Sequence, residues 1–531
     1  MAHLHVTDLS YAHPGGDALF HDVTFKLGAG RHAGLVGANG VGKSTLLRIL
    51  SGELESGAGD VSAGGRILAM PQDVGTGEGT IRELLLMGAP PRTRRAGLAL
   101  LACERDLAAG DEDAGVRLGE LIGEWSDLGG YELEGRWDAV CRRIARAGLS
   151  EIGDRPAVTL SGGERKRLVL ELLLTSDAPI LLLDEPDNFL DIPAKRWLEG
   201  ALRATRKTIL LISHDRELLA AATDTIVTLE AGGAWVHDGS YATYAEARAK
   251  RQKRFGDALA QWNEEEKRLR ELVRIFKERA RYSPDLAKRA SAFETRHKRF
   301  VAEGPPPAPV TEQVINVRLV GGDSARKVVT LDKVTIDGLV RPFSDEIHFG
   351  ERVGLIGPNG SGKTHVMGLL GGGEAPADGR VVLGPRVSPG LFTQLNRRED
   401  FAGRTLADIV EERTGAYETA MRGLARYRLQ DAAARKVETL SGGQRARLEI
   451  LCLELEGHNL LLLDEPTDNL DVESCEALEQ ALDGFAGTVV AVSHDRAFLR
   501  RLDRFLLLDH DGRVTGLPDV RSALEALGAE A

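Results

Sequence analysis

The chain alternates short, uninterrupted apolar runs with longer segments in which apolar residues recur every three or four positions. The short runs have the length and continuous hydrophobicity of strands that are buried on both faces of a parallel sheet. The longer segments have the spacing of helices that bury one face. We therefore predict an α/β fold with buried strands at residues 33–36, 180–185, 208–212, 460–465 and 488–492, and a helix at residues 45–50.

A helical pattern occupies the middle of the chain. Between Tyr244 and Phe300, two sets of apolar residues follow helical spacing, and Tyr282–Asp285 interrupts them. Each predicted helix has one apolar stripe, and an antiparallel hairpin buries both stripes. The proline-rich stretch Gly304–Pro309 ends the second helix. The stripes consist of Phe255, Leu259, Trp262, Leu269, Leu272 and Phe276, and of Leu286, Ala290, Phe293, His297 and Phe300.

Four motifs occur twice in the same order. The segment GANGVGKS at positions 37–44 recurs as GPNGSGKT at positions 357–364. LSGG (160–163), DEP (184–186) and SHDR (213–216) recur at 440–443, 464–466 and 493–496, with the same spacing between them. Such a repeat predicts two copies of one domain. We place the first copy at residues 1–243, with an extra helical insertion at about residues 90–146. The hairpin linker is placed at residues 244–309 and the second copy at residues 310–531.

Composition restricts the class of protein. Of the 531 residues, 42% are hydrophobic and 28% are charged, which is ordinary for a globular chain and excludes wholesale disorder. No apolar run approaches the ~20 residues that cross a bilayer, and the first residues do not resemble a signal peptide. The four cysteines are isolated, which is typical of a reducing compartment. We expect a cytoplasmic protein without membrane insertion.

The charge is unevenly distributed. The chain carries −12 in total, but residues 246–304 contain 17 Lys and Arg and 10 Asp and Glu, a net charge of +7, which leaves −19 for the rest. A basic segment on an acidic protein favours a phosphate-rich partner.

The motif GxxxxGK[S/T], placed between a strand and a helix, predicts a phosphate-binding loop. Its glycines let backbone N–H groups surround the β- and γ-phosphates, and the helix N-terminus adds positive potential. The lysines neutralise phosphate oxygens, and Ser44 and Thr364 ligate Mg²⁺. Two matches in the same context argue against a chance glycine-rich turn. The predicted residues are Gly37, Asn39, Gly40, Gly42, Lys43, Ser44 and Thr45, and Gly357, Asn359, Gly360, Gly362, Lys363, Thr364 and His365.

Two acids end a buried run in each copy. We predict that Asp184 and Asp464 hold Mg²⁺ through its water shell, and that Glu185 and Glu465 orient or deprotonate the water that attacks the γ-phosphate. A solitary Asp-Glu pair is usually only a solvated strand end. Here both pairs lie at the same distance before a histidine, which favours the catalytic interpretation.

Histidines and glutamines complete the predicted sites. His214 and His494 follow apolar strands, each at the same distance after its aspartate, and we predict that they contact the γ-phosphate. Gln72 and Gln394 each follow an apolar stretch and are predicted to bond Mg²⁺ or water. The predicted metal ligands are therefore Ser44, Gln72, Asp184, Thr364, Gln394 and Asp464.

The LSGG motif at the start of a helix is a second anion site. A serine side chain and free N–H groups at a helix N-terminus suit a phosphate. Each P-loop already has its own helix N-terminus, so we expect the motif to act across a dimer of the two copies. The residues are Ser161, Gly162 and Gly163, and Ser441, Gly442 and Gly443.

The combination of these four motifs resembles the nucleotide-binding domains of ATP-binding cassette proteins, and the resemblance covers nearly all of the chain twice. It implies hydrolysis of ATP with Mg²⁺. It also implies that the two cassettes of one monomeric chain pair head to tail. ATP on Lys43 would then face Ser441, and ATP on Lys363 would face Ser161.

The resemblance also implies further site residues. Asp191 and Asp471 match the D-loops that couple the two sites, and Tyr11 matches the aromatic residue that stacks on adenine, where the second copy has Ile336. The family usually shows DEPTNHLD, but the first copy has DEPDNFLD and the second DEPTDNLD. We therefore expect the two sites to differ in affinity or rate.

Two cassettes, no membrane span and a charged helical hairpin resemble the ABC-F family of translation factors. In that family the hairpin enters the ribosomal E site, the ATP-closed form is bound, and hydrolysis releases it. The resemblance implies contact of the hairpin with rRNA and tRNA, to which Lys and Arg supply affinity without reading sequence. The candidates near the turn are Arg270, Arg274, Lys277, Arg279, Arg281, Lys288 and Arg289.

Other interpretations stay open. Within the family, the protein is either a housekeeping translation factor or a ribosome-protection protein for antibiotic resistance, and the short turn at Tyr282–Asp285 favours the former. The insertion resembles an arm that touches the ribosomal stalk in some members. A fused ATPase subunit of a membrane importer is the main alternative. A DNA-repair ATPase would usually have zinc ligands or very long coiled coils, which the sequence lacks.

Overall fold

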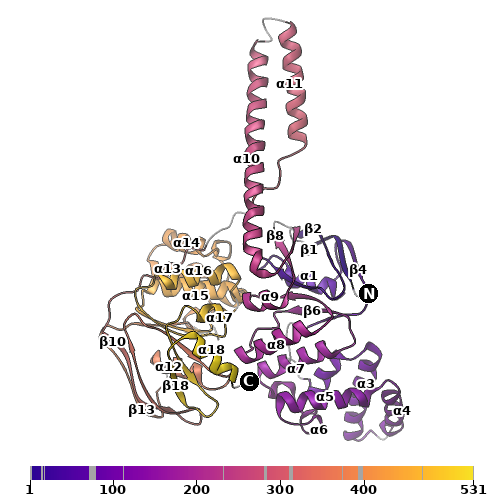
Figure 1. Cartoon of the computed structure of the whole chain (residues 1–531), viewed down its shortest axis with the longest axis vertical. Helices are drawn as coiled ribbons and strands as arrows, with labels where there is room; N and C mark the ends of the chain where they lie inside the picture. Colours follow the sequence, from indigo (N-terminus) through magenta and orange to yellow (C-terminus); the bar gives the residue numbers. More distant parts are fainter. Residues whose placement is uncertain are drawn as a thin grey trace. The chain divides into compact units, whose positions relative to one another are not determined.

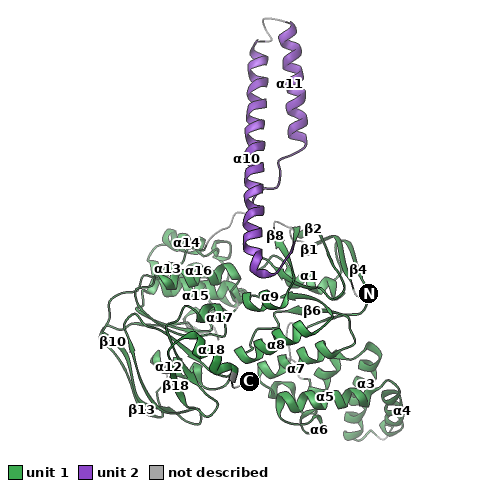
Figure 2. Ribbon diagram, viewed as in Figure 1, with its two compact units in different colours: residues 1–236, 314–531 green, residues 237–313 purple. Residues whose placement is uncertain are grey.

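The structure is a computed structural model (Figure 1). It describes residues 3–13, 16, 18–70, 79–111, 113–230, 233–279, 284–309, 315–373, 375–392, 399–468 and 470–529. The predicted site residues Gln72, Gln394 and Arg281, and part of the predicted turn, lie outside these ranges. The chain divides into two compact units, shown in Figure 2: residues 1–236 with 314–531, and residues 237–313.

A six-stranded sheet forms the centre of the first copy. Its strands lie in the order β5 (Ile67–Ala69), β6 (Ile180–Asp184), β7 (Thr208–Ile212), β3 (His32–Val36), β8 (Thr225–Glu230) and β9 (Gly233–Asp238), and the first five are parallel. All residues of β7 and all of β6 except Asp184 are buried, which explains their unbroken hydrophobicity. Glu185 was predicted as part of the strand but follows it, with φ 47°.

A second, antiparallel sheet and one helix pack against this sheet. An antiparallel sheet, in the order β2 (Ala18–Leu27), β1 (Leu4–Ala12) and β4 (Ala58–Ala63), shares a core with α1 (Lys43–Leu50). The other helices that bear on the sites are α7 (Gly162–Thr175), α8 (Ile192–Ala204) and α9 (Arg216–Ala222).

The segment between the P-loop and the LSGG motif is helical in the first copy. Its helices are α2 (Ile81–Leu85), η1 (Leu86–Gly88), α3 (Pro91–Ala108), α4 (Ala114–Asp127), α5 (Gly130–Ala145), α6 (Leu149–Ile152) and η2 (Ala157–Thr159). The rings of Trp125 and Trp137 pack 6.3 Å apart and are buried where α4 and α5 meet.

The second copy repeats the arrangement. Its six-stranded sheet has the order β14 (Pro389–Phe392), β15 (Leu460–Asp464), β16 (Thr488–Val492), β12 (Arg352–Ile356), β17 (Arg504–Leu508) and β18 (Val514–Leu517), and β18 alone of these pairs antiparallel. Its antiparallel sheet is β11 (Val340–His348), β10 (Lys327–Ile336) and β13 (Asp378–Leu383).

The helices of the second copy include α12 (Lys363–Leu370), α15 (Gly442–Glu456), α16 (Val472–Asp483), α17 (Arg496–Leu499) and α18 (Val520–Ala529). Shorter elements lie between β14 and α15 in the sequence: η4 (Glu399–Phe401), α13 (Leu406–Thr414), α14 (Tyr417–Arg426), η5 (Gln430–Ala432) and η6 (Val437–Thr439). The two sheet systems establish the predicted fold, an α/β protein with two P-loop cassettes.

The second unit contains α10 (Tyr241–Arg279) and α11 (Pro284–Ala302). Trp262 stacks on Phe300 with ring centroids 5.2 Å apart, and Phe276 stacks on Phe293 at 5.0 Å. Later residues of α10 thus meet earlier residues of α11, so the helices run antiparallel. These contacts fall on the apolar stripes, which meet as the spacing predicts.

Candidate active sites

Both P-loops close around their own lysine. Gly42 and Gly362 have φ values of 103° and 101°, a left-handed conformation that favours glycine, and the helices begin at the next residue, two positions before the predicted start at Thr45. Lys43 Nζ donates to two loop carbonyls at 2.7 and 3.2 Å, and Lys363 Nζ donates to the equivalent pair at 2.8 Å each. Burial lowers the pKa of both lysines.

A hydroxyl and a carboxylate meet beside each lysine. Ser44 hydrogen-bonds Asp184 and Thr364 hydrogen-bonds Asp464, and burial raises the pKa of both acids. Buried oxygen donors of this kind suit Mg²⁺, which prefers a few carboxylate and hydroxyl ligands together with phosphate and water. The donor set therefore fits the predicted metal ligands that the structure describes.

In the first copy, the predicted base is partly open. His214 Nε2 lies 3.5 Å from Glu185 Oε1, and Asn188 Nδ2 donates to Glu185 Oε2 at 2.5 Å. The hydrogen bond from His214 lowers the pKa of Glu185. The side chain of Glu185 is 39% exposed.

In the second copy, the equivalent base is enclosed. His494 Nε2 lies 3.4 Å from Glu465 Oε1, and the His494 backbone N–H donates to Glu465 Oε2 at 3.0 Å. The Glu465 side chain is only 6% exposed, and burial raises its pKa to about 8. Burial and the charge of Lys363 lower the pKa of His494 well below its usual range. The two sites therefore present their glutamates in different electrostatic states.

Residues of both copies surround one cavity of 440 Å³. The first copy contributes its LSGG residues together with Asp187, Phe189, Leu190 and Lys195. The second copy contributes its P-loop and catalytic residues. The predicted site residues on its wall are Ser161, Gly162, Gly163, Asn359, Gly360, Gly362, Lys363, Thr364, His365, Asp464, Glu465 and His494.

Hydrogen bonds join the two copies at both P-loops. Asn359 Nδ2 donates to the Phe189 carbonyl at 3.0 Å, and a Cβ on Gly163 would lie 3.1 Å from that same carbonyl. At the other site, the Asn39 backbone N–H donates to Asp471 Oδ2 at 3.4 Å. The atypical Phe189 thus contacts the second site through its backbone.

Several predicted residues also have local roles in the fold. Ser161 and Ser441 cap α7 and α15 and accept the backbone N–H of the third helical residue. Tyr11 is half-buried on β1, with its ring 6.2 Å from that of Phe20. Ile336 packs against the core of the second copy. Asp191 and Asp471 cap α8 and α16.

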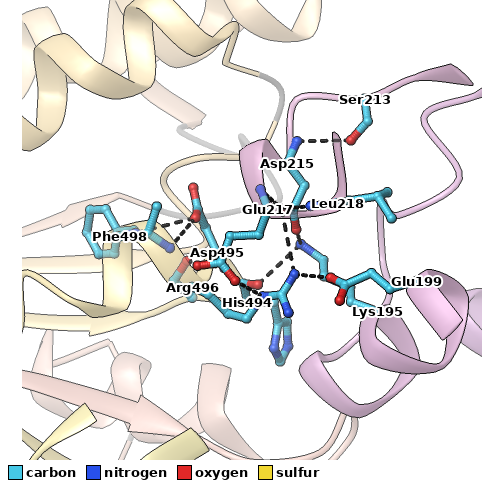
Figure 3. A network of polar contacts seen from close by, with 12 residues as sticks. Lys195, Glu199, Ser213, Asp215, Glu217, Leu218, His494, Asp495, Arg496 and Phe498 are labelled. Atoms are coloured by element: carbon cyan, nitrogen blue, oxygen red, sulfur yellow. Dashed lines mark hydrogen bonds and ion pairs between the residues drawn. The ribbon is translucent and has the colours of Figure 1, made fainter. Parts of the chain in front are cut away.

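The arginine of each SHDR motif, for which the sequence predicted no role, forms an ion pair with the other copy. Arg216 pairs with Glu479 on α16 of the second copy. Arg496 pairs with Glu199 on α8 of the first copy, as Figure 3 shows. Glu199 and Glu479 occupy corresponding positions of the two copies, so these pairs are equivalent. A signal for these residues exists in the sequence, because both copies carry a glutamate at this equivalent position outside the motifs.

The basic candidates of the linker line its exposed surface. Arg270 and Arg274 are 68% and 66% exposed and pair with glutamates of their own helix. Lys277 pairs with Glu294 of α11 at 3.0 Å. The remaining described candidates, Arg279, Lys288 and Arg289, are exposed.

The described part of the chain contains no helix that is both long and apolar enough to cross a membrane. A family model described as "ABC transporter" matches residues 20–188 and 340–468, more than half of the chain. The chain belongs to the ATP-binding cassette family. It is therefore an ATPase, and its two P-loop sites are those of a tandem cassette protein.

Relatives place this cassette protein in the F branch of the family. An "Antibiotic resistance protein" of Mycobacteroides abscessus is 44% identical, covering 97% of this chain and 98% of the relative. "ABC transporter F family member 2" of Arabidopsis thaliana is 31% identical, covering 94% and 75%. "Energy-dependent translational throttle protein EttA" of Mycobacterium tuberculosis is 32% identical, covering 92% and 88%.

A solved structure has the same fold at low identity. The "RNase-L Inhibitor" matches with a TM-score of 0.60 and 20% identity, covering 98% of this chain and 92% of that chain. The likeness concerns the tandem cassette fold alone.

Proposed function

We propose that this protein binds the ribosome, with its hairpin in the E site, while its two cassettes are closed on ATP, and that hydrolysis releases it. The observation that carries the proposal is the basic hairpin. Residues 246–304 carry +7 in a chain of −12, and the basic side chains near the turn that the structure describes are exposed. The name of the EttA relative supports a role in translation.

The hairpin chemistry suits RNA more than a protein groove. Its apolar residues are used in packing α10 against α11, as the two ring stacks show. Its outward side chains include an excess of long cations, which bind phosphate oxygens with a strong dependence on salt and without reading base sequence. A cytoplasmic location follows from a ribosomal partner.

The site residues define the test. In the Glu185→Gln, Glu465→Gln double variant, ATP would bind at both sites but would not be hydrolysed, because neither site retains a carboxylate to activate water. We expect this variant to sediment with ribosomes when ATP is present and to remain in the supernatant without ATP. A variant that binds ATP but never sediments with ribosomes would contradict the proposal.

A matched pair of charge reversals tests the hairpin itself. Lys288→Glu with Arg289→Glu changes the hairpin by −4 charges, and Arg422→Glu with Arg521→Glu makes the same change on exposed positions of the second cassette. We expect only the hairpin pair to abolish sedimentation with ribosomes, and both pairs to keep basal ATPase activity. Equal binding by the two variants would remove the hairpin from the proposal.

Resistance to a ribosome-targeting antibiotic is the second candidate. The sequence alone favoured a housekeeping factor, but the 44% identical relative is named an antibiotic resistance protein. Expression in a susceptible strain should then raise the inhibitory concentration of one antibiotic class, and the Glu185→Gln, Glu465→Gln variant should not. If the inhibitory concentration changed for no class of ribosome-targeting antibiotic, the housekeeping interpretation would be favoured instead. Copurification of a permease would instead favour a transporter subunit.

A further inference from the structure

A buried ion pair of the first copy borders the second site. Lys195 on α8 is 8% exposed, Asp215 is 7% exposed, and Lys195 lines the same cavity as Lys363 and His494. Buried charges are costly unless they are paired and hydrogen-bonded. The contacts of Lys195 therefore indicate what it does there.

Lys195 joins the two histidine loops. Its Nζ donates to Asp215 Oδ2 at 3.2 Å and to the His494 backbone carbonyl at 3.2 Å (Figure 3). Asp215 directly follows His214, and its carboxylate caps α9. One ammonium group thus bridges the loop that carries the first site's histidine and the loop that carries the second site's histidine.

Only the first copy carries the lysine of this bridge. The position equivalent to Lys195 in the second copy is Cys475, whose Sγ faces the Thr467 and Leu470 carbonyls of its own copy at 3.7 and 3.9 Å. The position equivalent to Asp187, which also lines the cavity, is Thr467. The second copy therefore has no ammonium at this position for the histidine loop of the first.

We propose that Lys195 is a positioning residue for ATP hydrolysis at the second site. Its bond to the His494 carbonyl fixes the loop whose N–H and ring both contact Glu465, at 3.0 and 3.4 Å. Glu465 is thereby held where it can act on the attacking water. Lys195 acts through His494 and does not have to touch ATP.

Removing the Lys195 ammonium is expected to change the rate of ATP hydrolysis, mainly at the second site. A displacement of a reacting group by about 1 Å costs up to ~10²-fold in rate. Removing the ammonium should therefore slow hydrolysis at the second site by at least about tenfold while ATP affinity stays the same, because the P-loop contacts remain. The first site should be much less affected, because Asp215, which follows His214, keeps the hydrogen bonds that its carboxylate accepts from the N–H groups of Glu217 and Leu218.

Two single-site backgrounds separate the sites. Glu185→Gln leaves only the second site active, and Glu465→Gln leaves only the first. In each background, phosphate release from one turnover of ATP is measured for Lys195→Met and for the double variant Asp187→Thr, Lys195→Cys. The double variant removes one charge of each sign and installs the residues that the second copy carries at the equivalent positions, which protects folding.

Cys475→Ala is the control, because it changes the equivalent position without touching the bridge. The inference depends on ATP hydrolysis and not on ribosome binding, so the isolated protein is used throughout. Slow turnover in the Glu185→Gln background alone, with unchanged ATP affinity and melting temperature, is the expected result. Wild-type turnover of the folded double variant at the second site would overturn the inference, as would equal slowing at both sites with a lower melting temperature.

Discussion

The ion pairs that Arg216 and Arg496 make across the two copies give a prediction, and the burial of their partners lets the expected loss of stability be estimated. Arg216 is 20% exposed and pairs across the copies with Glu479, which is 3% exposed. Replacing Arg216 by Met leaves a buried carboxylate with one weaker partner, Arg501 at 3.4 Å. Removing one member of a buried pair costs roughly 3–5 kcal/mol, and the remaining arginine places our expectation at about 3 kcal/mol.

A double-mutant cycle isolates the pair. Glu479→Gln alone should cost less, because Arg216 can still reach Glu476, which is 51% exposed. The coupling between the two changes should be about 2 kcal/mol, within the range found for residues in direct contact. The assay is urea unfolding followed by circular dichroism for the parent, both single variants and the double variant. Arg422→Met, at a 73% exposed position, should change stability little.

The pH dependence gives an independent check. Burial already raises the pKa of Glu479, and loss of Arg216 raises it further. A carboxyl whose pKa is higher in the folded state than in the unfolded state destabilises the fold above that pKa and not below the unfolded value. The loss in the Arg216→Met variant should therefore shrink as the pH falls. Additive single effects, within about 0.5 kcal/mol, or a loss independent of pH would refute the reasoning.

Three further predictions concern the sites and the linker. Burial raises the pKa of Glu465 to about 8, and the hydrogen bond from His214 lowers the pKa of Glu185. The kcat/KM of the Glu185→Gln variant, which relies on Glu465, should therefore rise until about pH 8, and the kcat/KM of the Glu465→Gln variant should level off at lower pH. Parallel pH profiles of the two variants would contradict this prediction. Trp262→Ala removes a ring stack of the hairpin and should speed amide exchange in α10 and α11 without changing basal ATPase activity. Lys363→Ala should abolish ATP binding at the second site only, measured as the number of nucleotides bound per chain.

Patterns of residues close together in the sequence determined the secondary structure and the motifs of this protein. The repeated motifs, the unbroken apolar runs and the two helical stripes each depend on residues close in sequence, and the sheets and the hairpin formed where they were expected. The signal is strong because a strand buried on both faces cannot carry polar residues except at its end, where Asp184 and Asp464 lie. Departures were small, such as Glu185 leaving the strand in a left-handed conformation.

Tertiary structure decided how the two copies act on each other. Lys195 looks like an ordinary surface residue of an amphipathic helix, and only the packing of the copies makes it a buried bridge to the His494 carbonyl. Arg216 and Glu479 lie far apart in the sequence, and their pairing depends on the docking of α16. The difference between Glu185 and Glu465 arises in the same way, because burial depends on residues brought from elsewhere in the chain. Sequence periodicity reports which face of an element is buried, but not which distant charge it meets.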